Sequence, residues 1–122
     1  MPKKVTIADY FAEHLLSNNG VLEVETGVKK SYAQVYENAM GLAAGLELKE
    51  GERLTVILTN SCAWVEYFLA SMIGGWVFSP VPYFVQVQEL DKILAYVKPK
   101  AIITDREDIN QKLGAKYKVL KV

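Results

Sequence analysis

The longest uncharged stretch of the chain runs from residue 67 to residue 88, and it limits how the chain can fold more than any other feature. A helix that spans a membrane needs about 20 consecutive apolar residues, so the stretch is long enough for one. It also contains Gly74, Gly75, Pro80 and Pro82, and each proline removes a backbone donor and clashes with the preceding helical turn. We therefore expect a buried helix, a glycine break and a buried strand. A membrane-associated segment is the alternative.

Composition and charge narrow the class of protein. The chain has 122 residues, of which 51% are hydrophobic and 23% charged, which predicts one folded domain over residues 1–122. Fourteen Lys and Arg residues balance fourteen Asp and Glu residues, so no basic excess favours nucleic-acid binding. One Cys and one His are too few for a disulfide framework or a typical zinc centre. With no secretory signal before Asp9, we expect a soluble cytoplasmic protein without a metal site.

The first third of the chain predicts a helix and a hairpin. Apolar residues recur at helical spacing over residues 7–15, after a cap at Thr6. Residues 21–25 and 28–31 flank a turn at Thr26-Gly27, which is typical of a β-hairpin.

A second helix follows the hairpin. Ser31 and Gln34 have the spacing of a capping box, and an apolar stripe continues behind them to Leu46. Gly41 and Gly45 lie four residues apart on this helix. We expect them to allow close approach of a neighbouring backbone rather than to bind a ligand.

The later part of the chain alternates strands and helices. The predicted strands are residues 54–59, 76–81, 101–104 and 117–122, and the predicted helices are 62–73, 87–97 and a segment from a cap at Asp105 to about Gly114. Pro80 and Pro82 place the second strand at an edge, or its second half outside the sheet. This order predicts an α/β fold: a largely parallel sheet flanked by helices, with an N-terminal helix and β-hairpin.

Asn60 and Ser61 are the candidate ligand contact, because they stand where a buried strand ends and a helix begins. In open α/β sheets ligands gather outside the carboxyl ends of strands, and free helix amides attract anions. A phosphate or carboxylate contact is therefore one hypothesis, and simple helix capping is the favoured alternative. No glycine-rich phosphate-binding fingerprint accompanies the two residues.

Other reactive side chains favour structural interpretations. Cys62 begins a predicted helix, where the helix dipole can stabilise a thiolate, but a small core residue is the simpler interpretation. His14 is expected to pack beside aromatic residues rather than to transfer protons. Two closely spaced acidic pairs are expected to be solvated: Glu23 with Glu25, and Glu50 with Glu52.

Five groups of residues occur in an order that is typical of one enzyme family. They are Ser31-Tyr32-Ala33-Gln34-Val35-Tyr36 with Leu42-Ala43-Ala44-Gly45-Leu46; Gly51-Glu52-Arg53-Leu54; Leu58-Thr59-Asn60-Ser61; Gly74-Gly75-Trp76-Val77-Phe78-Ser79-Pro80-Val81; and Glu89-Leu90 through Tyr96 with Ala101-Ile102-Ile103-Thr104-Asp105. From residue 6 to residue 105 the chain resembles the amino-terminal portion of the adenylate-forming enzymes, the AMP-binding acyl-CoA synthetase family.

This resemblance implies a ligase that uses ATP and Mg to adenylate a small carboxylic acid and then forms a thioester with CoA, as in fatty acid metabolism. The family's phosphate loop and catalytic lysines have no counterpart in these residues. We therefore expect a scaffold without catalytic or cofactor-binding residues, whose partner is the remainder of the parent polypeptide. An uncovered apolar surface would favour self-association. The alternative is a free-standing binding or interaction module without catalytic activity.

Overall fold

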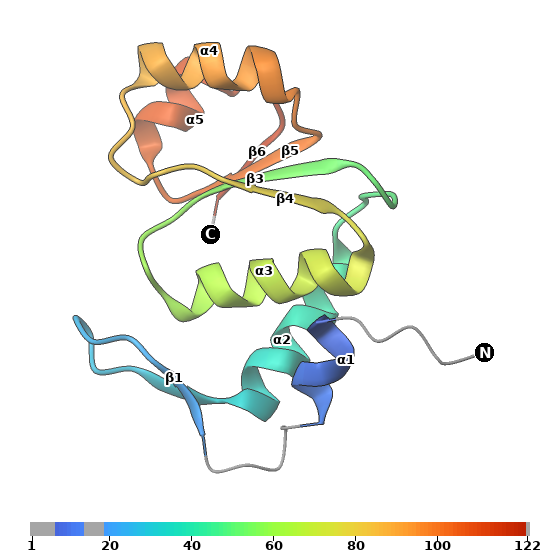
Figure 1. Cartoon of the computed structure of the whole chain (residues 1–122). Helices are drawn as coiled ribbons and strands as arrows, with labels where there is room; N and C mark the ends of the chain where they lie inside the picture. Colours follow the sequence, from blue (N-terminus) through green and yellow to red (C-terminus); the bar gives the residue numbers. More distant parts are fainter. Residues whose placement is uncertain (1–6, 14–18, 122) are drawn as a thin grey trace. The chain divides into compact units, whose positions relative to one another are not determined.

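The computed structural model describes residues 7–13 and 19–121, which belong to two compact units (Figure 1). Unit 1 comprises Met1–Glu47 and Asn60–Gly75, and unit 2 comprises Leu48–Thr59 and Trp76–Val122. The assignment of residues 1–122 to one domain stays a prediction.

The described residues of unit 1 form a small hairpin and three helices. Its elements are α1 (Ile7–Ala12), β1 (Gly20–Leu22), β2 (Lys29–Ser31), α2 (Tyr32–Gly45) and α3 (Cys62–Gly74). Strands β1 and β2 pair antiparallel, with Val21 opposite Lys30, so the predicted hairpin is confirmed. The predicted cap at Thr6, as well as His14 and Leu15, lies outside the described residues.

Helix α2 begins with the predicted capping box. The backbone N–H of Gln34 donates to Ser31 Oγ at 3.2 Å, and the backbone N–H of Ser31 donates to Gln34 Oε1 at 2.9 Å. The expectation for Gly41 and Gly45 was wrong. Apart from its chain neighbours and the nearby backbone of α2 itself, a Cβ at either position would meet no described atom within 4 Å, because both glycines are exposed rather than packed against a neighbouring backbone.

Helix α3 carries the buried half of the uncharged stretch. It ends at the predicted glycine pair: Gly75 has φ 72°, and its N–H donates to the carbonyl of Ser71. The rest of the stretch is divided between a strand, a loop and the start of a later helix. In the part of the chain that the structure describes, no helix combines the length and apolar character needed to cross a membrane.

Unit 2 is a parallel four-stranded sheet with two helices. Its elements are β3 (Arg53–Ile57), β4 (Val77–Pro80), α4 (Val87–Val97), β5 (Ala101–Thr104), α5 (Glu107–Leu113) and β6 (Val119–Lys121). The strand order is β4-β3-β5-β6, and every neighbouring pair is parallel. The α/β prediction is therefore confirmed, and β4, which contains Pro80, lies at an edge of the described sheet as expected.

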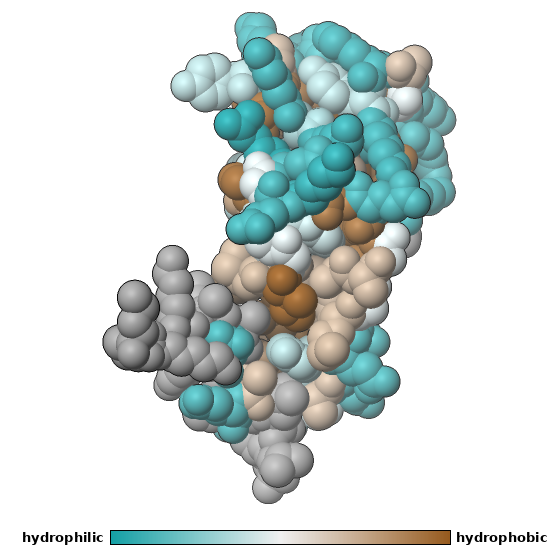
Figure 2. All heavy atoms as spheres, turned by 90° about the vertical axis from the view of Figure 1, so that its right-hand side faces the viewer, coloured by the Kyte–Doolittle hydropathy of each residue, from teal (hydrophilic) through white to brown (hydrophobic). Residues whose placement is uncertain are grey.

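The core of unit 2 lies between the sheet and helices α4 and α5, which cover the same face (Figure 1). Its buried members are Ile57, Val81, Leu90, Leu94, Ile102, Ile109 and Leu113. Figure 2 shows hydrophilic side chains gathered over the part of unit 2 that contains these helices. Helix α4 is thus the predicted surface helix: Leu90 and Leu94 are buried toward the core, and the exposed side carries Glu89 and Lys92 as well as Tyr96.

The predicted cap of α5 at Asp105 was wrong. The helix begins after Arg106, which makes no side-chain cap, and Asp105 is exposed. The hydroxyl of Thr104, one residue before Asp105, binds the backbone at this turn instead. It accepts the backbone N–H of Arg106 at 3.1 Å and donates to the carbonyl of Ile57 at 2.9 Å, so one buried side chain links the β5 end to β3.

Candidate functional site

The predicted ligand contact lies at the amino end of α3. Ser61 is the N-cap, and its hydroxyl accepts the backbone N–H of Trp64 at 3.2 Å. Asn60 precedes it and is exposed. The capping role of Ser61 is therefore present, whereas an anion contact at Asn60 and Ser61 stays a prediction.

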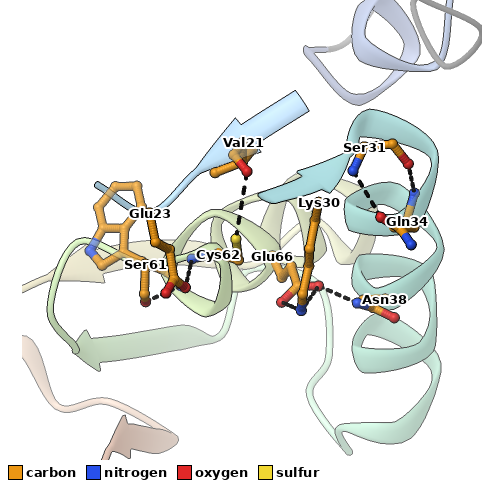
Figure 3. A network of polar contacts seen from close by, with 10 residues as sticks. Val21, Glu23, Lys30, Ser31, Gln34, Asn38, Ser61, Cys62 and Glu66 are labelled. Atoms are coloured by element: carbon orange, nitrogen blue, oxygen red, sulfur yellow. Dashed lines mark hydrogen bonds and ion pairs between the residues drawn. The ribbon is translucent and has the colours of Figure 1, made fainter. Parts of the chain in front are cut away.

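A carboxylate from the hairpin binds at the same helix end (Figure 3). Glu23 Oε1 accepts the backbone N–H of Cys62 at 2.7 Å, and its Oε2 accepts the hydroxyl of Thr26 at 2.7 Å. These hydrogen bonds, the one from Cys62 first, lower the pKa of Glu23. Glu23 is therefore bonded rather than merely solvated, and an external anion at this helix end would meet its negative charge.

Cys62 is a core residue. Its side chain is 2% exposed, and Sγ lies 3.9 Å from the carbonyl oxygen of Val21. Burial first, and then the charge of Glu23, raises the pKa of the thiol above its ordinary value. The helix end thus does not produce a thiolate here, because desolvation and a neighbouring carboxylate act in the opposite direction.

Glu66 is the centre of a polar network that joins three elements of unit 1 (Figure 3). Its carboxylate, on α3, is buried and accepts both from Lys30 Nζ on β2, at 3.3 and 3.4 Å, and from Asn38 Nδ2 on α2. The same charge adds to burial in raising the pKa of the neighbouring Tyr67, which keeps its phenol protonated. In the sequence Glu66 is the single charged residue of an otherwise uncharged helix, and a buried carboxylate in such a helix needs partners of this kind.

Arg106 organises the loop that follows β4 in unit 2. Its Nη1 donates to the carbonyls of Tyr83, at 2.8 Å, and Val85, at 2.5 Å. Its Nε and Nη2 bind the two oxygens of Asp108 at 3.1 and 2.6 Å, and this pairing lowers the pKa of Asp108. The loop holds Phe84 88% exposed, near the carboxyl end of β4. Arg106 was not predicted from the sequence, because it belongs to no periodic pattern or short motif.

These donors do not fit the nucleotide and metal that the resemblance implies. Within residues 7–13 and 19–121, no three His, Cys, Asp or Glu side chains are grouped to hold a metal ion. The N–H of Cys62 already binds Glu23, and Nε, Nη1 and Nη2 of Arg106 are directed to Asp108 and two carbonyls. We therefore assign no step of ATP, Mg or CoA chemistry to the residues described.

Known proteins are similar to this chain in sequence and in fold. The AMP-binding enzyme family matches residues 11–121. A mitochondrial medium-chain acyl-CoA ligase of Rattus norvegicus is 28% identical over 116 residues, which cover 93% of this chain and 18% of that protein. The chloroplastic/peroxisomal 2-succinylbenzoate–CoA ligase of Arabidopsis thaliana is 27% identical over 93 residues, 74% of this chain and 17% of its own length.

Among solved structures, VinN bound to 3-methylaspartate has a similar fold. The TM-score is 0.85 at 22% identity, over 96% of this chain and 34% of VinN. The chain spans less than a fifth of the length of the two curated ligases. Because the family match extends over nearly the whole chain, the protein belongs to the AMP-binding enzyme family and corresponds to an amino-terminal portion of it.

Proposed function

We propose that this chain is the amino-terminal scaffold of an acyl-CoA synthetase-like ligase. The parent enzyme would use ATP and Mg to convert a small carboxylic acid into an acyl-adenylate and would then transfer the acyl group to CoA. The family match over residues 11–121 carries this proposal. It is supported by the names of the two curated relatives, both of which are CoA ligases.

The internal use of the polar side chains supports a scaffold role. Glu66 is bonded to Lys30 and Asn38, and Arg106 is bonded to Asp108 and two carbonyls of its own unit. A catalytic group instead has to reach the reacting atoms. The groups with the most developed polar contacts thus hold the fold, and the chemistry is assigned to the remainder of the parent polypeptide.

The same proposal covers partners and location. The remainder of the parent polypeptide is the principal partner, and exposed apolar side chains such as Leu22, Val24 and Phe84 favour self-association of the chain on its own. We place the enzyme in the cytoplasm and in fatty acid metabolism. Cell fractionation tests the location, and a panel of carboxylic acids tests the pathway class.

The decisive experiment is pyrophosphate exchange by the polypeptide translated from the full reading frame that contains this segment. Labelled pyrophosphate should enter ATP only when an accepted carboxylic acid is present, and CoA should then yield a thioester. The panel should include medium-chain fatty acids and aromatic acids. A folded polypeptide that shows no exchange with any acid, at saturating ATP and Mg, would contradict the proposal.

A further inference from the structure

One edge of the hairpin in unit 1, formed by residues 20–24 and called the β1 edge below, has backbone groups that face away from β2. The N–H of Glu23 and the carbonyl of Asn19 bind backbone groups in the second half of the hairpin, at 2.8 and 3.3 Å. Backbone direction alternates along an antiparallel strand. The N–H groups of Leu22 and Val24 and the carbonyls of Gly20 and Leu22 therefore point outward. Among residues 7–13 and 19–121, no strand pairs with this edge.

The opposite edge of the hairpin is closed. On β2, the N–H of Ser31 faces away from β1 and donates to Gln34 Oε1 at 2.9 Å, as part of the capping box (Figure 3). Lys29 on the same edge is exposed, and exposed lysines protect edge strands from pairing. Residues 20–24 contain neither lysine nor proline. A further strand can thus add on the β1 side only, which favours a closed pair over a continuing sheet.

The side chains of the β1 edge are apolar on the face that points away from α3. Leu22 is 57% exposed and Val24 is 87% exposed. Glu23, between them, points to the other face and binds the N–H of Cys62 on α3. An exposed apolar edge strand is prone to pair with another chain. The β1 edge therefore combines free backbone groups with apolar side chains.

A second copy of the chain fits this edge in an antiparallel register related by a two-fold axis. With Leu22 opposite Leu22 of the second copy, the N–H of each meets the carbonyl of the other. The N–H of each Val24 then meets the carbonyl of the other copy's Gly20, which has no side chain to obstruct it. The same register places Glu23 opposite Val21 and not opposite a second Glu23. The β1 edge is therefore complementary to itself in hydrogen bonding and opposes no like charges.

We propose that the β1 edge pairs with the β1 edge of a second copy of this chain, giving a continuous antiparallel sheet in the order β2-β1-β1-β2. This proposal rests on the proposed function in that it locates the self-association proposed there, but it involves no catalytic step. A chain that does not pair would leave the ligase assignment standing, and an enzyme without pyrophosphate exchange would leave the pairing standing. The paired segment is short, so we expect a dimer that forms as concentration rises rather than an obligate one.

Site-resolved amide hydrogen exchange tests the pairing directly. As the concentration of the 122-residue chain rises to about 1 mM, the amides of Leu22 and Val24 should exchange several-fold more slowly. The amide of Glu23, which is already bonded within the hairpin, should change much less. Exchange of Leu22 and Val24 that does not depend on concentration would overturn the proposal. Slow exchange at every concentration would show that the edge is covered within one chain.

Two charge variants test the register. Leu22→Lys and Leu22→Glu each place like charges opposite one another across the two-fold axis, so each variant alone should be monomeric in sedimentation equilibrium. An equimolar mixture should dimerise again, because unlike charges then face each other. Phe84→Lys and Phe84→Glu are the matched controls, since Phe84 is exposed in unit 2, and each should dimerise like the unchanged chain. Circular dichroism checks that every variant is folded. Dimers of either Leu22 variant alone, or a mixture that stays monomeric, would overturn the proposed register.

Discussion

Unit 1 and unit 2 are each stabilised internally by a different kind of contact. In unit 1, the buried carboxylate of Glu66 joins β2, α2 and α3 through Lys30 and Asn38. In unit 2, aliphatic side chains such as Leu94 and Ile102 fill the space between the sheet and its helices. A polar network is sensitive to the loss of a partner, whereas an aliphatic core is sensitive to the arrival of a charge. The two units should therefore respond to different substitutions.

The largest effect is expected in the core of unit 2. Leu94 is fully buried, so Leu94→Asp places an unpaired carboxylate in an apolar environment. We expect the free energy of unfolding to fall by about 3 kcal/mol or more, enough to unfold a marginally stable domain. Tyr96→Asp is the matched control, because Tyr96 lies on the same helix and is 89% exposed. Urea unfolding followed by circular dichroism measures both, and equal midpoints would refute the buried stripe of α4.

The next effect tests the network of unit 1. Glu66→Ala leaves Lys30 and Asn38 without their shared acceptor, and we expect a loss of about 1–3 kcal/mol. Lys30 is partly exposed and can turn toward water, which keeps the loss below that of a fully buried pair. Glu37→Ala on exposed α2 surface is the control. A Glu66→Ala variant as stable as the control would show that the network contributes nothing to unit 1.

Two glycines of unit 1 should respond in opposite directions. Gly41 lies inside α2 with open space at its Cβ position, so Gly41→Ala should stabilise the chain by about 0.5–1 kcal/mol. Gly75 has φ 72°, and Gly75→Ala should destabilise the chain by about 1 kcal/mol because a side chain is strained there. Thermal unfolding of the two variants measures the signs. A loss of stability in Gly41→Ala would instead support the expectation that a neighbouring backbone lies close to this glycine.

The smallest effect is a pH dependence. The folded pKa of Glu23 lies below its ordinary value of 4.5, so the unfolded chain binds more protons in that range. Its contribution to stability is present above pH 4.5 and is lost as the pH falls through the folded pKa. Glu23→Gln should flatten this part of the acid unfolding curve. An unaltered curve in Glu23→Gln would mean that the bond to Cys62 N–H has no effect on stability.

Sequence periodicity predicted the elements better than the contacts between them. The parallel strands and α4 follow from apolar runs and stripes, and Ser31 with Gln34 follows from local spacing, so both could be predicted. Glu66 and Lys30 are 36 residues apart, and Arg106 binds the carbonyl of Tyr83 across 23 residues. Neither spacing is periodic, so only the fold brings these groups together. The assignment of Asp105 as a cap was wrong because α5 begins one residue later, after Arg106, whose backbone N–H is bound by the hydroxyl of Thr104.

The central claim is that these 122 residues form a scaffold of an AMP-binding enzyme without catalytic power of their own. Its most direct test is carboxylate-dependent exchange of labelled pyrophosphate into ATP by the isolated chain, beside the longer polypeptide at equal concentration. We predict exchange by the longer polypeptide and none by the isolated chain. Robust exchange by the 122-residue chain alone would contradict the scaffold assignment and would require a catalytic site within it.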